Sequence, residues 1–239
     1  MEATVREGQA PALVVQLAAD EEIHAEAGAM MFMTGDVAMD TEFGAQDLKG
    51  GIKRAFSGES MFHVRYKGGP GGGVVGLTGP YPGSIRQHEL DGEIICERHA
   101  YLCHHGEVTV EPIIAAKRGM GIMGGGEGFI LQKISGKGTV WLHAGGDFVD
   151  FDLVEGQNLV VDTGCMVMFE STVTYETKMQ KGLRSAFAGG EGLFLVYMTG
   201  PGHVTLQTLP FSRIAQQVEK AEGGGKGERG GILGNLLEG

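Results

Sequence analysis

A histidine, a cysteine and a second histidine alternate along one predicted strand, and they are the residues of this chain best suited to metal chemistry. Alternate side chains of an extended strand share a face, which would bring together His99, Cys103 and His105. Imidazole and thiolate ligands suit zinc or another transition metal. The spacing matches no standard zinc motif, and the positions aligned with Cys103 elsewhere in the chain are Phe32 and Met168. We therefore prefer a core thiol beside packed or surface histidines, and we keep the metal site as an alternative.

Three glutamates that each follow a glycine offer a second possible site. Glu59, Glu127 and Glu191 recur at nearly even intervals along the chain. If threefold symmetry relates their surroundings, the three carboxylates would occupy equivalent places and could bind a cation through oxygen ligands. Each could equally accept backbone hydrogen bonds within its own turn. We prefer the structural role, because duplication of a segment copies its structural parts first.

The sequence lacks the signatures of common catalytic and nucleotide-binding sites. Residues typical of a strand follow the glycine-rich stretch 124–128, whereas a phosphate-binding loop needs Gly-Lys-Ser/Thr and a helix. The serines lack the context of a nucleophile elbow. Trp141, the single tryptophan, is predicted to anchor the core or an interface. We therefore expect no cofactor and a protein that is not an enzyme.

A pattern that occurs three times along the chain would position these residues. In each copy a Gly-Glu pair opens an apolar strand, which leads through a glycine-containing turn into a second strand. A fixed period of this kind indicates one structural unit used three times. Short strands separated by turn signals predict an all-β sandwich or barrel. We predict one body over residues 1–239, with repeats at 12–87, 88–150 and 151–210.

An earlier strand of each unit is apolar on both faces and begins after an acidic residue. The aligned segments are 26–33, 97–104 and 162–169. Strands buried on both faces are what stacked sheets or a closed barrel need. Glu26, Glu97 and Asp162 open these segments. They have the same two interpretations as the other acids, either as ligands of a cation or as acceptors of backbone hydrogen bonds.

Two glycine-rich segments stand outside this pattern. Residues 68–73 of the first unit are predicted to form a longer hairpin tip or to allow the close approach of another backbone. After Pro210, Phe211, Ile214 and Val218 recur at helical spacing and predict a short amphipathic helix over 211–222 that packs on the body. Residues 223–239 are predicted to be a flexible tail. Its apolar end would dock on the body or on a neighbouring subunit, or bind weakly to a membrane or to a partner.

Composition limits the partners and the compartment. The formal net charge is −11 and the basic residues are scattered, so we expect no nucleic-acid partner. The three cysteines form no CxxC pair, which is typical of a reducing compartment. The acidic start lacks the features of a signal peptide, and no run of about 20 apolar residues exists. We therefore predict a cytoplasmic protein without stable membrane insertion.

The triple Gly-Glu repeat, the glycine-rich stretch 119–128 before Phe129, and the tail with Ile232-Leu233-Gly234 resemble one known family. It is the family named for altered inheritance of mitochondria protein 24, and the resemblance runs from about Leu13 to the C-terminus. It implies three intertwined subdomains similar to the tryptophan RNA-binding attenuation protein. Each would be a small β-sandwich, a short relative of the double-stranded β-helix, in a pseudo-threefold arrangement. RNA binding is not carried over, since it needs a repeated basic surface that this acidic chain lacks.

We predict an uncharacterised, non-enzymatic scaffold or interaction protein that self-associates, as a trimer or a multiple of three. The reason is that the sheet edges of so β-rich a chain must be covered, and oligomerisation is one way to cover them. One alternative is a small-molecule or metal-binding β-module with a cupin-like site near His99, Cys103 and His105. Another is a peripheral membrane-organising protein, by analogy with mitochondrial relatives associated with inner-membrane organisation.

Overall fold

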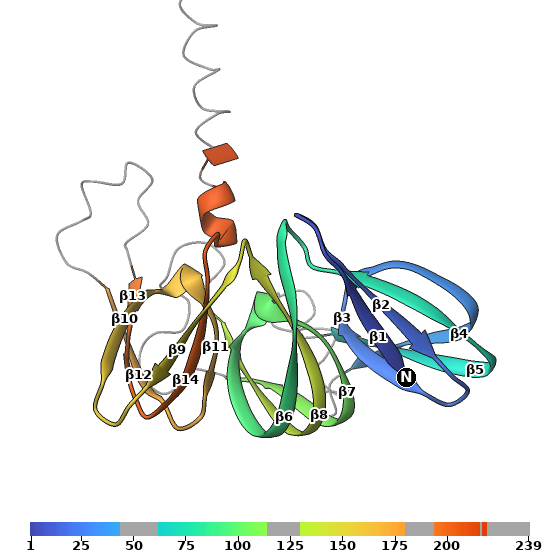
Figure 1. The fold of residues 1–239 in the computed structure, drawn as a ribbon, viewed down its shortest axis with the longest axis horizontal. Helices are drawn as coiled ribbons and strands as arrows, with labels where there is room; N and C mark the ends of the chain where they lie inside the picture. The colour runs from blue at the N-terminus through green and yellow to red at the C-terminus, as the bar shows by residue number, and fades with distance from the viewer. Residues whose placement is uncertain (44–61, 114–129, 180–193, 216, 219–239) are drawn as a thin grey trace, which may run out of the picture.

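Strands dominate the computed structural model, which describes residues 1–43, 62–113, 130–179, 194–215 and 217–218 (Figure 1). Two short 3-10 helices and one helical segment near the C-terminus accompany the strands in these residues. The predicted all-β class with a short C-terminal helix is therefore confirmed. No helix in the described ranges has the length and apolar character needed to span a membrane.

The first group of strands is built around β5. Its members are β1 (Glu2–Arg6), β2 (Ala12–Leu17), β3 (Glu22–Glu26), β4 (Met30–Phe43) and β5 (Phe62–Thr78). β5 is long enough to pair antiparallel with β2 near its C-terminal end and with β3 near its N-terminal end, and it pairs with β4 along its other edge. In β2, every second residue is buried, as expected for a strand with one face on the core.

The glycines of residues 68–73 lie inside β5, where that strand passes from β3 to β2. A Cβ atom at Gly68 would clash with the carbonyl oxygen of Ala18. Gly72 has a φ of +61°, and a Cβ there would lie 2.9 Å from the carbonyl oxygen of Leu17. Of the two interpretations of this segment, close approach of another backbone is the correct one.

The second and third groups follow along the chain. The second comprises β6 (Gly83–Glu97), the 3-10 helix η1 (Arg98–Ala100), β7 (Tyr101–Pro112) and β8 (Leu131–Gly145). The third comprises β9 (Phe148–Leu153), β10 (Asn158–Asp162), η2 (Thr163–Cys165), β11 (Met166–Glu170), β12 (Thr174–Met179), β13 (Phe194–Thr199) and β14 (Gly202–Gln207). β8 pairs with both β6 and β7, while β14 pairs with β9 and β11, and β13 with β10 and β12. The boundary predicted at residues 87 and 88 falls inside β6.

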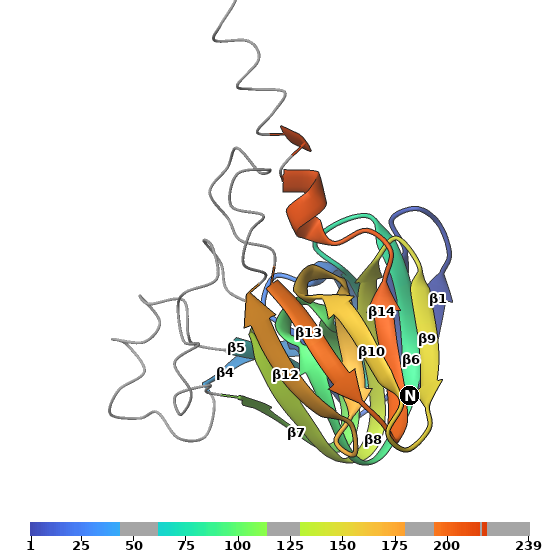
Figure 2. The same ribbon diagram turned by 90° about the vertical axis from the view of Figure 1, so that its left-hand side faces the viewer.

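Strand pairing also joins neighbouring groups. β7 pairs with β3, with Ala25 opposite Cys103, and β11 pairs with β6, with Cys96 opposite Met168. Figure 1 shows the result as three strand groups in a row, with β4 and β5 towards one end and β10, β12 and β13 towards the other. Figure 2 shows the helical segment after Pro210 beyond the end of β14.

The three aligned segments share a local irregularity. β4 has a bulge against β5 between Met30 and Phe32, and β7 has one against β8 between Tyr101 and Cys103. The pairing of β11 with β14 is interrupted at the aligned position, between residues 166 and 168. A bulge leaves one extra residue unpaired and increases the local twist, so these strands bend at corresponding places.

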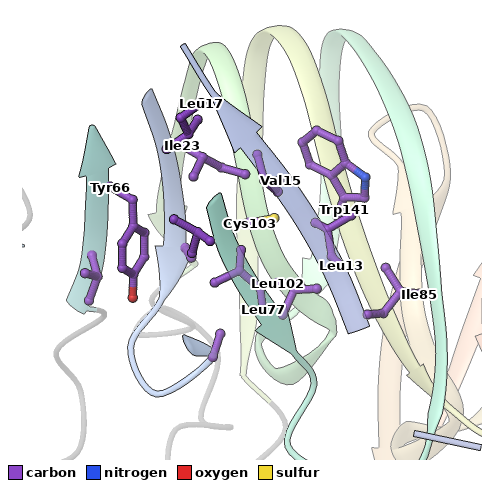
Figure 3. Packing of buried hydrophobic residues seen from close by; sticks show 14 residues of the cluster. Leu13, Val15, Leu17, Ile23, Tyr66, Leu77, Ile85, Leu102, Cys103 and Trp141 are labelled. Carbon is purple, nitrogen blue, oxygen red and sulfur yellow. The ribbon is translucent and has the colours of Figure 1, made fainter. Parts of the chain in front are cut away.

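The buried apolar residues form three clusters, and the first is shared between strand groups. It combines residues of β2, β3 and β5 with Leu102, Cys103 and Trp141 from β7 and β8 (Figure 3). Trp141 and Cys103 are both buried in this cluster, which confirms the core thiol and the core position of Trp141. The second cluster lies mainly in the second group, and the third mainly in the third group.

Two expectations from the sequence need correction. Burial of the aligned segments on both faces holds for the starts of β7 and β11 but not for β4. The reason is that β4 pairs with β5 alone among the described strands.

The C-terminal helix packs only in part. Phe211 stacks on the ring of Tyr81, with ring centroids 5.6 Å apart, yet Phe211 and Val218 remain 53% and 54% exposed. Residues 219–239, including the predicted tail, lie outside the described residues.

Candidate functional site

The three residues predicted as possible metal ligands lie in three different environments. His99 is in η1 and not on the strand as predicted, and its Nδ1 lies 3.1 Å from Oε1 of Glu97. Cys103 is buried in the first core cluster. His105 directs its Nδ1 to the carbonyl oxygen of Glu22 at 2.9 Å. Within the described ranges, no group of three or more His, Cys, Asp or Glu side chains could hold a metal ion.

The electrostatics of Cys103 also disfavour chemistry at this position. Complete burial raises the pKa of its thiol well above the ordinary value, because a thiolate would lose its hydration in the apolar core. The thiolate is the form that binds metals and attacks electrophiles. Cys103 therefore behaves as a small apolar core residue, as does the aligned Met168, whereas the aligned Phe32 is exposed.

Two of the acids that open the aligned segments act as caps. The Glu97 carboxylate accepts a hydrogen bond from the backbone N–H of His99 at 2.8 Å. The Asp162 carboxylate accepts the equivalent bond from Gly164 at 3.0 Å. Each side chain satisfies a backbone donor at the start of a 3-10 helix, so the structural interpretation is confirmed for these two. Glu59, Glu127 and Glu191 lie outside the described residues.

Glu26 differs from the other two acids. Desolvation raises the pKa of its carboxyl from 4.5 to about 7, and the nearby negative charge of Glu97 adds to this effect. The positive charges of His99 and Arg98 oppose the shift without cancelling it. Near neutral pH, Glu26 is therefore divided between its neutral and ionised forms. A raised carboxyl pKa is common at functional sites, but within the described ranges Glu26 belongs to no group of side chains that could hold a metal ion.

A histidine cluster that no sequence pattern indicated lies at the junction of the first two strand groups. The cluster consists of His24, His63 and His104 with Tyr101. The rings of His24 and His104 stack with centroids 5.0 Å apart and planes at 5°. The ring of His63 lies 5.2 Å from that of Tyr101 and 6.3 Å from that of His104. Strand pairing of β3 with β5 and β7 brings these residues together, so no spacing in the sequence could have indicated the cluster.

A hydrogen bond within the histidine cluster connects β7 to β3. The Tyr101 hydroxyl donates to the carbonyl oxygen of His24 at 3.0 Å, and its oxygen lies 2.8 Å from Nδ1 of His104. Burial and, to a smaller extent, the positive charges that His24, His63 and His105 can carry together lower the pKa of His104 to about 3. The His104 imidazole is therefore neutral at physiological pH. Its Nδ1 contact with Tyr101 lies within β7, and the stacking of its ring on His24 joins β7 to β3.

Four consecutive apolar residues at the start of β4 are exposed. Met30, Met31, Phe32 and Met33 are between 37% and 53% exposed. We call these four residues the β4 edge surface. Their aligned counterparts, residues 101–104 of β7 and 166–169 of β11, are at most 5% exposed. The difference follows from pairing, because β7 and β11 each lie against a strand of the preceding group, whereas β4 in this chain has no such neighbour among the described strands.

A matching edge lies at the other end of the row. β10 pairs with β13 and with no second strand in the described part of the chain. Its Val160 side chain is 51% exposed. The positions of β3 and β6 aligned with β10 each contact a strand of the following group. An apolar residue on an unpaired strand edge is unusual for a monomer, since exposed edges invite pairing with another chain.

Comparisons with known proteins identify a family that matches most of this chain. A model of the family described as mitochondrial biogenesis AIM24 matches residues 3–209. An uncharacterized protein of Streptococcus pyogenes serotype M6 is 24% identical over 222 residues, covering 90% of this chain and 88% of the relative. The crystal structure of a Streptococcus pyogenes protein is similar with a TM-score of 0.74 at 22% identity, covering 92% of this chain and 99% of that one. At this identity the structural likeness shows the fold alone.

Proposed function

The chain belongs to the mitochondrial biogenesis AIM24 family, as its Gly-Glu repeat indicated, and on that premise we propose that it is a non-enzymatic scaffold that self-associates. The single observation that carries the proposal is the β4 edge surface. Four consecutive apolar side chains are exposed there, while their eight aligned counterparts are buried. Exposed apolar residues on a strand that is paired along one edge only are suited to pairing with another chain.

The proposal includes three repeats of one unit in a pseudo-threefold arrangement similar to the tryptophan RNA-binding attenuation protein. Support comes from the antiparallel pairing of each aligned segment with a later strand of its own group and from the irregularity at the same aligned position in each group. The acidic caps of η1 and η2 add to this support. If the groups are equivalent units, each can pair with a neighbouring group on both sides, and the two end groups each lack one such neighbour among the described strands.

The proposal also includes a homo-oligomer, a trimer or a multiple of three, in the cytoplasm. The three cysteines are free thiols, as expected in a reducing compartment. A scaffold needs no catalytic centre, and the candidate side chains of the described strands have structural roles. Cys103 belongs to the core, Glu97 and Asp162 are caps, and His104 stacks on His24 where β7 meets β3.

Native mass spectrometry and light scattering across a hundredfold range of protein concentration test the proposal. We expect a discrete homo-oligomer without additional bound mass. A monomer at every concentration would overturn self-association. A discrete bound metal or metabolite would instead support the alternative of a binding module, and the measured mass would indicate its chemical class.

A further inference from the structure

We propose that β10 of one copy pairs antiparallel with β4 of a second copy, so that copies assemble head to tail. This inference rests on the self-association proposed above and names the two edges and their register. Because the two surfaces differ, the interface is heterologous, and such interfaces build rings or filaments according to the rotation between copies. The partner is a second copy of this chain.

The register follows from the two junctions between groups that the described strands form. Ala25 of β3 lies opposite Cys103 of β7, and Cys96 of β6 lies opposite Met168 of β11. In both junctions, the first residue (Ala25 or Cys96) immediately precedes the acid that opens the aligned segment of its own group. The residue opposite it (Cys103 or Met168) immediately follows the irregularity in the aligned segment of the next group. At the missing junction the aligned residues are Val161 of β10 and Phe32 of β4. The two internal junctions agree with each other, so the register of the third is determined without adjustment.

The neighbouring pairs follow from the same alignment. His24 lies opposite His104, and Ile95 lies opposite Phe169. The corresponding residues of the missing junction are Val160 and Met33. The internal junction between β6 and β11 has one further pair, Ile94 with Glu170, which corresponds to Leu159 with Thr34.

The exposure of these residues agrees with the inferred pairing. Val160 is 51% exposed and Met33 is 43% exposed. Their counterparts Ile95 and Phe169, which face each other across an existing junction, are 8% and 1% exposed. Val160 and Met33 are apolar, and together they would form a cross-strand pair of the kind that stabilises sheets. Each end of the row therefore exposes one apolar residue of a cross-strand pair. The equivalent pair, Ile95 with Phe169, is buried at the junction of β6 and β11.

The position of the two edges indicates a second copy and not closure of one chain. Figure 1 shows β4 and β10 towards opposite ends of the row of strand groups, along the longest axis of the molecule. Neither strand pairs with the other in the described structure. A second copy carries both complementary edges and the same apolar residues, so it satisfies the β4 edge of one chain with the β10 edge of the next.

Disulfide trapping tests the register. In a Cys165→Ser background, Val160→Cys and Met33→Cys are placed in separate chains, and the two variants are mixed and oxidised. Directly opposed antiparallel residues have Cα atoms about 4.5 to 5.5 Å apart, within the range of a disulfide. We expect covalent dimers that contain one chain of each variant. Because each chain has one introduced cysteine, a link between the two variants must be intermolecular.

A matched control uses Met39→Cys in place of Met33→Cys. Met39 is also an exposed methionine of β4, but it lies about 20 Å farther along the strand at about 3.3 Å per residue. We expect no mixed dimer from this pair. Equal yields from Met33 and Met39 would contradict the register.

Charge variants give a second measurement. Val160→Lys and Met33→Lys should each raise the dissociation constant of the oligomer at least about tenfold, because pairing would bury an uncompensated charge. Val154→Lys is the control, since Val154 is 69% exposed and precedes β10, and it should change the constant less than about twofold. Circular dichroism of each variant checks that the fold is retained.

The outcomes separate the two proposals. A homo-oligomer that gives no mixed disulfide and is unaffected by Val160→Lys would overturn the β10–β4 pairing while leaving self-association in place. A wild-type protein that stays monomeric at all concentrations would overturn both. A mixed disulfide with the predicted pair, absent with Met39, together with weakened assembly of both lysine variants would establish the inferred interface.

Discussion

Replacement of Glu26 by glutamine should stabilise the protein, and more so at high pH. The carboxyl lies at the end of β3, where desolvation and the charge of Glu97 raise its pKa from 4.5 to about 7. A raised carboxyl pKa means that the folded state holds the proton more tightly than the unfolded state. The contribution of the protonated Glu26 to the free energy of unfolding is therefore complete below about pH 4.5, and it is lost as the pH rises towards 7. Glutamine has a similar shape and cannot ionise, so it avoids this loss.

The magnitude follows from the two pKa values. A shift of one pKa unit corresponds to about 1.4 kcal/mol. The loss at pH 8 is then about 3 kcal/mol, and the loss at pH 5, where only part of the interval has been crossed, is about 1 kcal/mol. Urea unfolding of wild type and Glu26→Gln at both pH values, at one fixed protein concentration, measures the difference. We expect the stabilisation by glutamine to grow by about 2 kcal/mol from pH 5 to pH 8.

An exposed carboxylate provides the control for this experiment. Glu107 of β7 is exposed, and Glu107→Gln should change the free energy of unfolding by no more than about 0.5 kcal/mol at either pH. Comparing each variant with wild type at the same pH removes the contribution of every other titrating group. The reasoning is refuted if Glu26→Gln destabilises the protein at pH 8, or if its effect is the same at pH 5 and pH 8.

Three further predictions concern the core, the cap and the histidine cluster. Trp141→Ala should lower the free energy of unfolding by about 3 to 5 kcal/mol, and a loss below about 1 kcal/mol in urea unfolding would contradict its role as a core anchor. Glu97→Ala removes the cap of η1 and should cost about 1 kcal/mol, whereas Glu97→Gln, which keeps an acceptor, should cost less in the same assay. His104 is held neutral because burial lowers its pKa to about 3, so its contribution is complete above about pH 6.5 and falls towards pH 3 by at most about 1.4 kcal/mol per pH unit. His104→Asn should flatten the acid side of a stability–pH profile, and an unchanged slope would exclude His104 as its source.

Local patterns in the sequence predicted much of the architecture. The repeated acidic residue followed by an apolar strand placed residues 26, 97 and 162 at aligned positions, and two of these acids cap 3-10 helices. The alignment of Cys103 with Phe32 and Met168 predicted a core thiol, and Cys103 is buried. These predictions succeeded because side-chain type and strand periodicity are local properties.

Predictions that depended on a neighbouring strand were less successful. The alternation of residue types places His99 on a strand, but the cap formed by Glu97 places it in η1. The segment 29–33 is as apolar in sequence as its counterparts, and yet its methionines and Phe32 are exposed. The histidine cluster joins three strands that are distant in sequence. For the last two, the outcome depends on which strand lies alongside, and periodicity within one segment carries no information about that.

The sequence by itself determined the strand content, the aligned acids and the apolar character of the segments that follow them, because these depend on residue type and short-range spacing. Only the tertiary structure decided which of those segments is covered. β7 and β11 are buried by the strand of a preceding group, whereas β4 belongs to the first group in the row and has no preceding one among the described strands. The same apolar strand is core in two places and exposed surface in the third, since burial is a property of the neighbour as much as of the residue.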